Sequence, residues 1–148
     1  MAVDVEIPQD KRVKGTRPGY ALDVRTLNFE TKIKLARDPR TPIKIMEALA
    51  EDKYDVRLAL ARNPFIPPSI MLKLIKGGNF EIQYSIVTNL RFLAKMGLLK
   101  EEDREKFKEV FSALSLSEHP SVRRGLVDNP VVPDELKVLV NKPPFSIS

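Results

Sequence analysis

The sequence predicts an all-α protein, a short α-solenoid of about four helical repeats with one inserted longer amphipathic helix. Two observations carry this prediction. The first is a recurring motif in which Asp or Asn is followed by proline and, after two further residues, by a second proline. The second is the apolar pattern upstream of each motif, which has the spacing of a single helix face. A recurrence of about 25 residues is typical of stacked helical repeats.

The motif marks four copies of one segment, which are centred on Asp38, Asn63, Asn89 and Asn129. Successive copies are 25, 26 and 40 residues apart, so the last interval contains an insertion. In the third copy Leu90 replaces the first proline. The aligned apolar residues are Leu35, Leu60, Ile86 and Leu126, with Val56, Ile82 and Val122 four residues earlier on the same helical face. We therefore expect each copy to contain a short helix of about two turns.

The prolines predict where these helices end and where the next ones begin. A residue that precedes proline is pushed out of the α region, so each Asp or Asn should end its helix. The second proline lacks an N–H and suits the first turn of the following helix. We expect Thr41 to cap the helix that starts at Pro42. Helices this short need neighbours to cover their apolar faces, which is why a stack is expected.

The repeated pattern resembles the variant leucine-rich repeat, in which Val-Arg-x-x-Leu-Ala-x-Asn-Pro-x-x-Pro is continued by Leu-x-x-Leu. The residues that carry the resemblance are Val56-Arg57, Leu60-Ala61, Asn63-Pro64 and Pro67, and again Val122-Arg123, Leu126-Val127, Asn129-Pro130 and Pro133. The resemblance covers roughly residues 31–90 and 120–141, with departures at Gln83 and Leu90. It implies short helices stacked into a right-handed superhelix, broadly like armadillo and HEAT arrays, and it implies no enzymatic residues.

One position of the repeat is polar in every copy, namely Lys32, Arg57, Gln83 and Arg123. One interpretation is a stripe that faces a ligand. The other is that each side chain caps carbonyls or pairs with acids of a neighbouring repeat, such as Asp55 or Glu81. We favour this structural use, because a residue that defines a repeat usually serves the stacking contact common to all repeats.

Residues 1–148 are expected to form one domain. We expect an arm at 1–20 that is basic and partly flexible, a helical-repeat body at 21–141 with an insertion at about 91–118, and a proline-rich tail at 142–148. The insertion predicts an amphipathic helix from about Lys100 to Ser115. Its Phe107 and Phe111 either pack on the core or contact a partner or a second copy. Phe145 and Ile147 either cap the last repeat or dock on another protein.

Positive charge is concentrated near the N-terminus. The formal net charge is +5, and residues 11–40 contain nine basic and three acidic residues. Such a segment can contact phosphates while an aromatic ring stacks on a base. The alternative is a solvated leader that becomes ordered against the first helices. The candidate contacts with nucleic acid or another partner are Lys11, Arg12, Lys14, Arg17, Tyr20, Arg25, Arg37 and Arg40.

Composition excludes several classes of site. The chain has no cysteine, which excludes disulfides, thiolate metal sites and cysteine nucleophiles. Its single histidine, His119, precedes a proline, and Gly77-Gly78 lacks the residues of a phosphate loop, so both are interpreted as turns. We expect no enzymatic activity, cofactor, metal or small-molecule substrate. Without a run of about 20 apolar residues, a cytoplasmic protein with no membrane contact is expected, and the many charged residues favour a thermophilic source.

The favoured function is a non-catalytic interaction or regulatory protein. It would bind a protein or a ribonucleoprotein complex, such as a ribosomal subunit, through a helical-repeat surface and a basic N-terminal edge. Two alternatives remain open. The first is direct RNA or DNA binding by the basic segment 11–40. The second is a purely protein-binding adaptor or a regulator that forms a homodimer.

Overall fold

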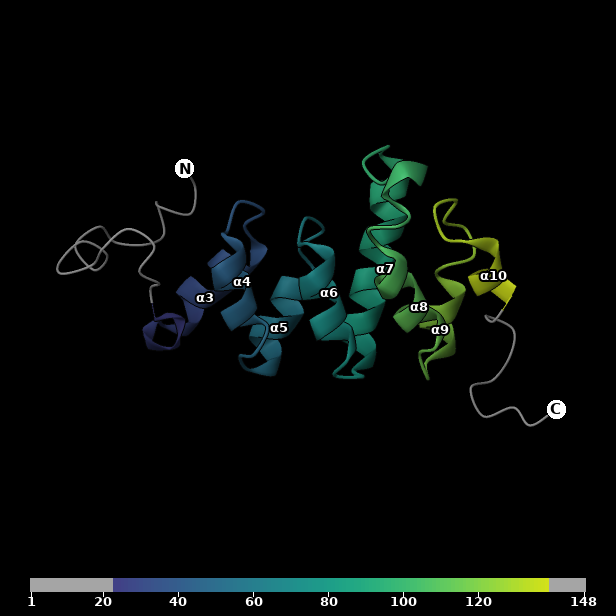
Figure 1. The fold of residues 1–148 in the computed structure, drawn as a ribbon. Helices are drawn as coiled ribbons and strands as arrows, with labels where there is room; N and C mark the ends of the chain where they lie inside the picture. Colours follow the sequence, from purple (N-terminus) through teal and green to yellow (C-terminus); the bar gives the residue numbers. More distant parts are fainter. Residues whose placement is uncertain (1–22, 139–148) are drawn as a thin grey trace. The chain divides into compact units, whose positions relative to one another are not determined.

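The computed structural model describes residues 23–138, which contain α-helices, two 3-10 turns and no β-strand (Figure 1). The all-α prediction is therefore confirmed for this part of the chain. The chain divides after Pro67 into two compact units. Unit 1 ends at Pro67 and unit 2 begins at Pro68, and each is described separately. The arm predicted at 1–20 and the tail predicted at 142–148 lie outside the described residues.

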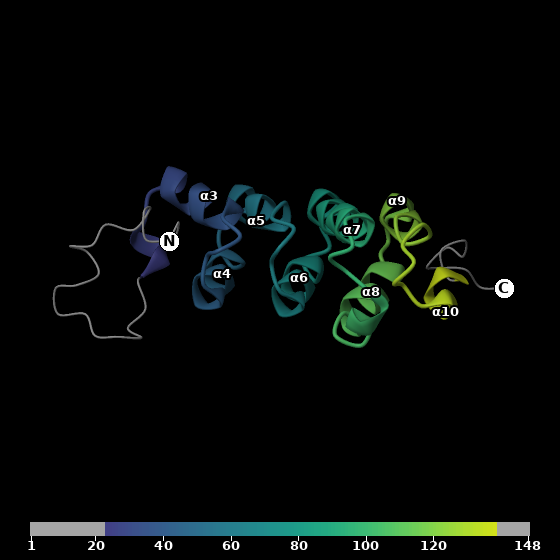
Figure 2. The same ribbon diagram turned by 90° about the horizontal axis from the view of Figure 1, so that it is seen from above.

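Unit 1 consists of the 3-10 turn η1 (Val24–Thr26) and the helices α3 (Phe29–Arg37), α4 (Ile43–Leu49) and α5 (Tyr54–Ala61). Helices α3 and α5 pack side by side and α4 packs on both, so the unit has two layers (Figure 2). The core between the layers contains the buried side chains Leu35, Met46, Leu49, Val56 and Leu60. The predicted apolar helix face is therefore the face that unit 1 buries.

Unit 2 has the same alternation of layers. Its helices are α6 (Pro68–Ile75), α7 (Phe80–Lys95), α8 (Lys108–Ser115), α9 (Pro120–Arg124) and α10 (Asp134–Lys137), and the 3-10 turn η2 (Glu101–Asp103) precedes α8. Helices α7 and α9 pack together in one layer, and α6, α8 and α10 form the other (Figure 2). The largest buried side chains include Ile70, Leu74, Ile86, Leu90 and Phe111.

The first two copies of the proline motif end helices, as predicted, whereas in the fourth copy α9 already ends at Arg124, ahead of Asn129-Pro130. Helix α3 ends at Arg37, just before Asp38-Pro39, and α5 ends at Ala61, just before Asn63-Pro64. In the third copy the predicted break is wrong, because α7 continues through Asn89 and Leu90 to Lys95. Leu90 has the N–H that proline lacks and does not clash with the preceding turn, so nothing interrupts the helical hydrogen bonds there.

The predicted cap at Thr41 is also wrong. Pro42 occupies the N-cap position of α4, one residue later than expected, and no side chain caps this helix. Thr41 is buried instead, and its hydroxyl donates to the carbonyl of Leu35 at 2.6 Å. A carbonyl near the end of α3 is thereby satisfied, and the turn between α3 and α4 is fixed against the helix.

The insertion forms a shorter helix than the predicted span of 100–115. The Asp103 carboxylate accepts a hydrogen bond from the Lys100 N–H at 2.8 Å, which closes η2, and α8 begins only at Lys108. Phe107 and Phe111 are buried in unit 2 with their ring centroids 6.1 Å apart. This pair therefore packs in the core of the unit, and its rings are not on the surface where a partner or a second copy would meet them.

A buried asparagine joins the two loops of unit 1. The Asn63 side-chain amide donates to the carbonyls of Ala36 and Asp38 at 3.0 and 3.2 Å. Its oxygen accepts a hydrogen bond from the Phe65 N–H at 3.0 Å. Two of these bonds reach the end of α3 and the third lies within the α5–α6 loop, so this loop is held beside the α3–α4 loop.

The equivalent residue in unit 2 makes only half of this arrangement. Asn129 accepts a hydrogen bond from the Val131 N–H at 3.0 Å, as Asn63 does from Phe65. Its amide nitrogen is buried and has no hydrogen-bond partner among residues 23–138. In the preceding copy, the carbonyls of residues 87 and 89 lie inside α7, where helical N–H groups occupy them. The uninterrupted helix explains why Asn129 finds no acceptor equivalent to those of Asn63.

The two asparagines give a matched test, because their exposed fractions are 2% and 1%. We expect Asn63→Ala to lower the free energy of unfolding by about 2–3 kcal/mol, since three hydrogen bonds are lost. Asn129→Ala loses one hydrogen bond and removes an unsatisfied donor, so we expect a loss of about 1 kcal/mol or less. Urea unfolding followed by circular dichroism measures both. Equal losses would contradict the assigned role of Asn63.

Candidate macromolecule-binding surface

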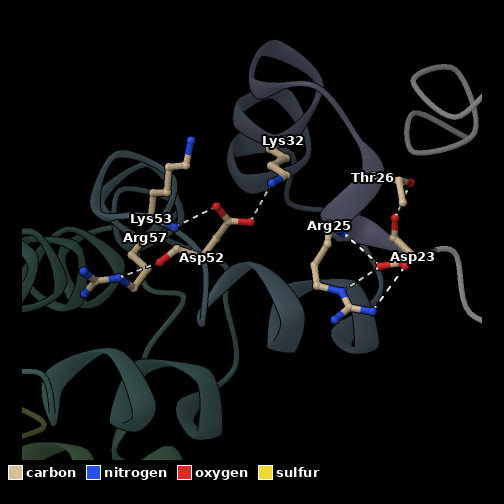
Figure 3. Close-up of polar contacts among 7 residues, drawn as sticks. All are labelled: Asp23, Arg25, Thr26, Lys32, Asp52, Lys53 and Arg57. Atoms are coloured by element: carbon tan, nitrogen blue, oxygen red, sulfur yellow. Dashed lines mark hydrogen bonds and ion pairs between the residues drawn. The ribbon is translucent and has the colours of Figure 1, made fainter.

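The polar position of the repeat is used internally in unit 1. The Arg57 guanidinium Nε donates to the carbonyl of Asp52 at 3.0 Å (Figure 3). The Lys32 ammonium lies 3.0 Å from the Asp52 carboxylate, and the exposed fractions of these two side chains are 12% and 9%. Lys32 and Arg57 therefore hold the segment between α4 and α5 from two sides.

The same position forms a buried polar network in unit 2. The Gln83 amide donates to the carbonyl of Ile75 at 2.9 Å and accepts a hydrogen bond from the Ser117 hydroxyl. Arg123 donates to the carbonyl of Ser117 at 2.6 Å. Gln83, Ser117 and Arg123 are all buried. Three of the four residues cap carbonyls, as predicted, and Lys32 pairs with an acid, which is Asp52 and not Asp55. They do not form a stripe on the surface.

The Asp52 carboxylate is held by two groups of unit 1. Burial by itself raises its pKa, but the Lys53 N–H, which donates at 2.7 Å, and the Lys32 ammonium outweigh that effect. The pKa of Asp52 is therefore lowered from its ordinary value. This carboxylate stabilises the fold in its ionised form (Figure 3).

Of the predicted contact residues, Phe107 and Phe111 are buried in unit 2, and the three arginines Arg25, Arg37 and Arg40 also lie in the described part of the chain. Lys11, Arg12, Lys14, Arg17, Tyr20, Phe145 and Ile147 lie outside the described residues. Arg25 is 3.1 Å from Asp23, and the hydrogen bonds from its side chain lower the pKa of that carboxyl (Figure 3). Part of the positive charge of Arg25 is thereby matched locally, which makes it the weakest of the three candidates.

Arg37 and Arg40 lie at the turn between α3 and α4, and both are exposed. The Arg37 side chain forms no hydrogen bond or ion pair with another residue of the described part. Arg40 is 3.5 Å from Asp38, yet its side chain remains 64% exposed. Arg37 and Arg40 therefore lie at the same turn. The charge of Arg37 has no acidic partner there, and the charge of Arg40 is partly balanced by Asp38.

Counting charges along the sequence missed a third arginine. Arg62 occupies the repeat position of Arg37, and its side chain is likewise exposed and without a partner among residues 23–138. Phe65 occupies the repeat position of Arg40 and is 49% exposed. Arg62 lies outside the basic segment 11–40, and only the register of the repeat could have indicated it.

These four residues form what we call the arginine edge: Arg37, Arg40, Arg62 and Phe65. The edge exists because Asn63 holds the two loops together. A guanidinium binds phosphate or carboxylate through two parallel hydrogen bonds, and an exposed ring offers a flat apolar surface beside it. The guanidinium groups of the arginine edge are therefore suited to binding anionic groups.

Two depressions in unit 2, of about 600 and 520 Å³, are lined by side chains of both charges from α6, α8, α10 and the turn before α8, and His119 lines neither. Residues 23–138 contain no group of three His, Asp or Glu side chains placed to hold a metal ion. No helix within that part of the chain is long and apolar enough to cross a membrane.

Comparisons of this chain with protein-family models, with curated proteins and with solved structures give no match. The interpretation of the surface therefore depends on its own geometry and charges.

The lowered pKa of Asp52 predicts how stability depends on pH. An aspartate has a pKa of about 3.9 in an unfolded chain, so the contribution of Asp52 is present above about pH 4 and is lost as pH falls through the lower folded value. We expect Asp52→Asn to cost about 1–2 kcal/mol of unfolding free energy at neutral pH. Urea unfolding from neutral to acidic pH should show the difference from wild type shrinking below about pH 4.

Glu47→Gln is the control, because Glu47 is an exposed residue of α4 that forms no described ion pair. It removes one negative charge from the same unit. A cost for Asp52→Asn that stays constant down to the lowest pH, or one that Glu47→Gln reproduces, would show that the ion pair with Lys32 is not its source.

Proposed function

We propose that the chain is a short helical-repeat protein of four stacked copies, similar to the variant leucine-rich repeat and to armadillo and HEAT arrays. Three features support this architecture. Both units alternate helices between two layers, the polar repeat position caps carbonyls in both, and an Asn accepts a hydrogen bond two residues ahead in both. In this proposal the copies form one right-handed solenoid.

We infer that this solenoid is a non-catalytic protein that binds RNA on a ribonucleoprotein partner in the cytoplasm. The arginine edge carries the proposal. Arg37 and Arg62 are exposed and have no ion-pair partner among the described residues. In contrast, Arg57 and Arg123 at the polar repeat position donate to backbone carbonyls. Cations that the fold does not use are available to neutralise phosphates.

The chemistry of the edge favours RNA over a carboxylate-rich protein. The planar guanidinium matches the geometry of phosphate, and the exposed Phe65 ring provides a platform on which an unpaired base can stack. Lys11, Arg12, Lys14 and Arg17, which precede η1 in the sequence, add four charges of the same sign. Single-stranded RNA is the ligand that uses both kinds of group.

The test is the salt dependence of RNA binding. Fluorescence anisotropy with a labelled single-stranded RNA gives the slope of log K against log salt, which is about 0.7 for each phosphate neutralised on a single strand. The triple variant Arg37→Ala, Arg40→Ala, Arg62→Ala should lose about 2 from the magnitude of that slope. Replacing Lys11, Arg12, Lys14 and Arg17 by Ala should lose about 3.

A second triple variant controls for net charge. Lys76, Lys106 and Lys108 are exposed in unit 2, and changing them to Ala removes the same three charges from outside the arginine edge. We expect this variant to keep the wild-type slope. An equal loss in both triple variants would show that only net charge matters, and an absence of RNA binding at low salt would refute the proposal.

A further inference from the structure

The second half of α7 has an exposed face that unit 2 does not use. At 100° per residue, Phe92 and Met96 form one row along the helix and Arg91 and Lys95 form the adjacent row. Phe92 is 45% exposed and Met96 is 59% exposed. Leu98, just beyond the end of the helix, is 57% exposed. Large apolar side chains gathered this way mark an interaction surface more often than scattered ones do. We call these five residues the α7 patch.

The α7 patch is held by a well-formed helix end. Gly97 has a φ of 74°, which ends α7, and the N–H groups of Leu98 and Leu99 both donate to the carbonyl of Leu93 at 2.8 and 3.1 Å. Leu99 is buried and anchors the turn, while Leu98 remains exposed. In Figure 1 this part of α7 extends past the helices on either side of it in unit 2, α6 and α9. The patch is thus a fixed, accessible platform.

The charges on the second half of α7 have one sign, and the acidic turn η2 (Glu101–Asp103) begins only after Lys100. Residues 82–100 include the basic residues Arg91, Lys95 and Lys100 and no acidic residue. Arg91 and Lys95 form no ion pair with another described residue, and both are exposed. An apolar row beside an unmatched basic row complements a surface that is apolar and acidic.

We propose that the α7 patch binds an acidic amphipathic helix of a partner protein. A helix with apolar residues at i, i+3, i+4 and i+7 can lay them against Phe92, Met96 and Leu98. Acidic residues flanking that stripe then meet Arg91 and Lys95. The patch belongs to unit 2 and is independent of the arginine edge, so this proposal holds whether or not the chain binds RNA.

Two other occupants fit the α7 patch less well. A second copy of the chain would bring Arg91 and Lys95 against the same basic residues, and like charges placed together at an interface disfavour the contact. Nucleic acid would satisfy the cations and stack on Phe92, but Met96 and Leu98 are aliphatic side chains that gain most from an apolar protein surface.

The test uses the full chain and two synthetic helical peptides as long as α7, 16 residues. Both carry the same leucine stripe, flanked by Glu in one peptide and by Lys in the other. Fluorescence anisotropy should show binding of the Glu peptide only. Phe92→Ser with Met96→Ser should weaken that binding by about tenfold or more, as expected for central apolar contacts. Arg91→Glu with Lys95→Glu should reverse the preference, so that the Lys peptide binds.

Tyr84→Ser is the matched control, because Tyr84 is an exposed aromatic residue in the first half of the same helix. It should leave the affinity for the Glu peptide unchanged. Equal affinity for the two peptides, a loss in Tyr84→Ser as large as in the Phe92, Met96 variant, or no binding of either peptide would overturn the proposal. Competition by single-stranded RNA or by phosphatidylserine vesicles that equals competition by unlabelled Glu peptide would also overturn it.

Discussion

The amide of Asn63 donates to two carbonyls of one loop while its oxygen accepts from another, and unit 1 depends on this side chain. A proline that ends a helix leaves carbonyl groups without helical partners. An asparagine before the next proline is long enough to reach those carbonyls and polar enough to satisfy them. The side chain therefore repairs the break that the motif creates. It also sets the distance between the loops that carry Arg37, Arg40 and Arg62.

One substitution in the motif changes the third copy. With Leu90 in place of proline, the carbonyls that an Asn would otherwise satisfy stay engaged in α7, and the Asn129 amide is left buried without a partner. The same substitution makes residues 91–95 helical. Arg91 stands at the repeat position of Arg40, which lies in a loop. Because α7 is not interrupted at Leu90, the Asn129 amide stays unsatisfied in unit 2. The same uninterrupted helix forms the surface on which the α7 patch lies.

Much of this fold could be predicted from the sequence, because proline and helical periodicity act locally. The ends of α3 and α5 follow from the residues beside them, and so does the face that each helix buries. The run of α7 through Asn89 and the late start of α8 depend on competition between hydrogen-bond partners. Thr41 illustrates this, since its hydroxyl donates to the carbonyl of Leu35, six residues earlier, and does not cap the helix that follows. Charge counting predicted Arg37 and Arg40 but not Arg62, which the tertiary contact of Asn63 places beside them.

The repeat thus divides its polar residues into two groups with different roles. Lys32, Arg57, Gln83 and Arg123 recur because the fold uses them, and their partners are carbonyls, Asp52 and Ser117. A recurring charge is therefore a poor guide to a binding site in this protein. Charges that the fold leaves unmatched are the better guide, and they include Arg37 and Arg62 in unit 1 and Arg91 and Lys95 in unit 2. Because they lie beside helix breaks or where a break is missing, the motif that shapes the backbone also places the charges on which both proposals depend.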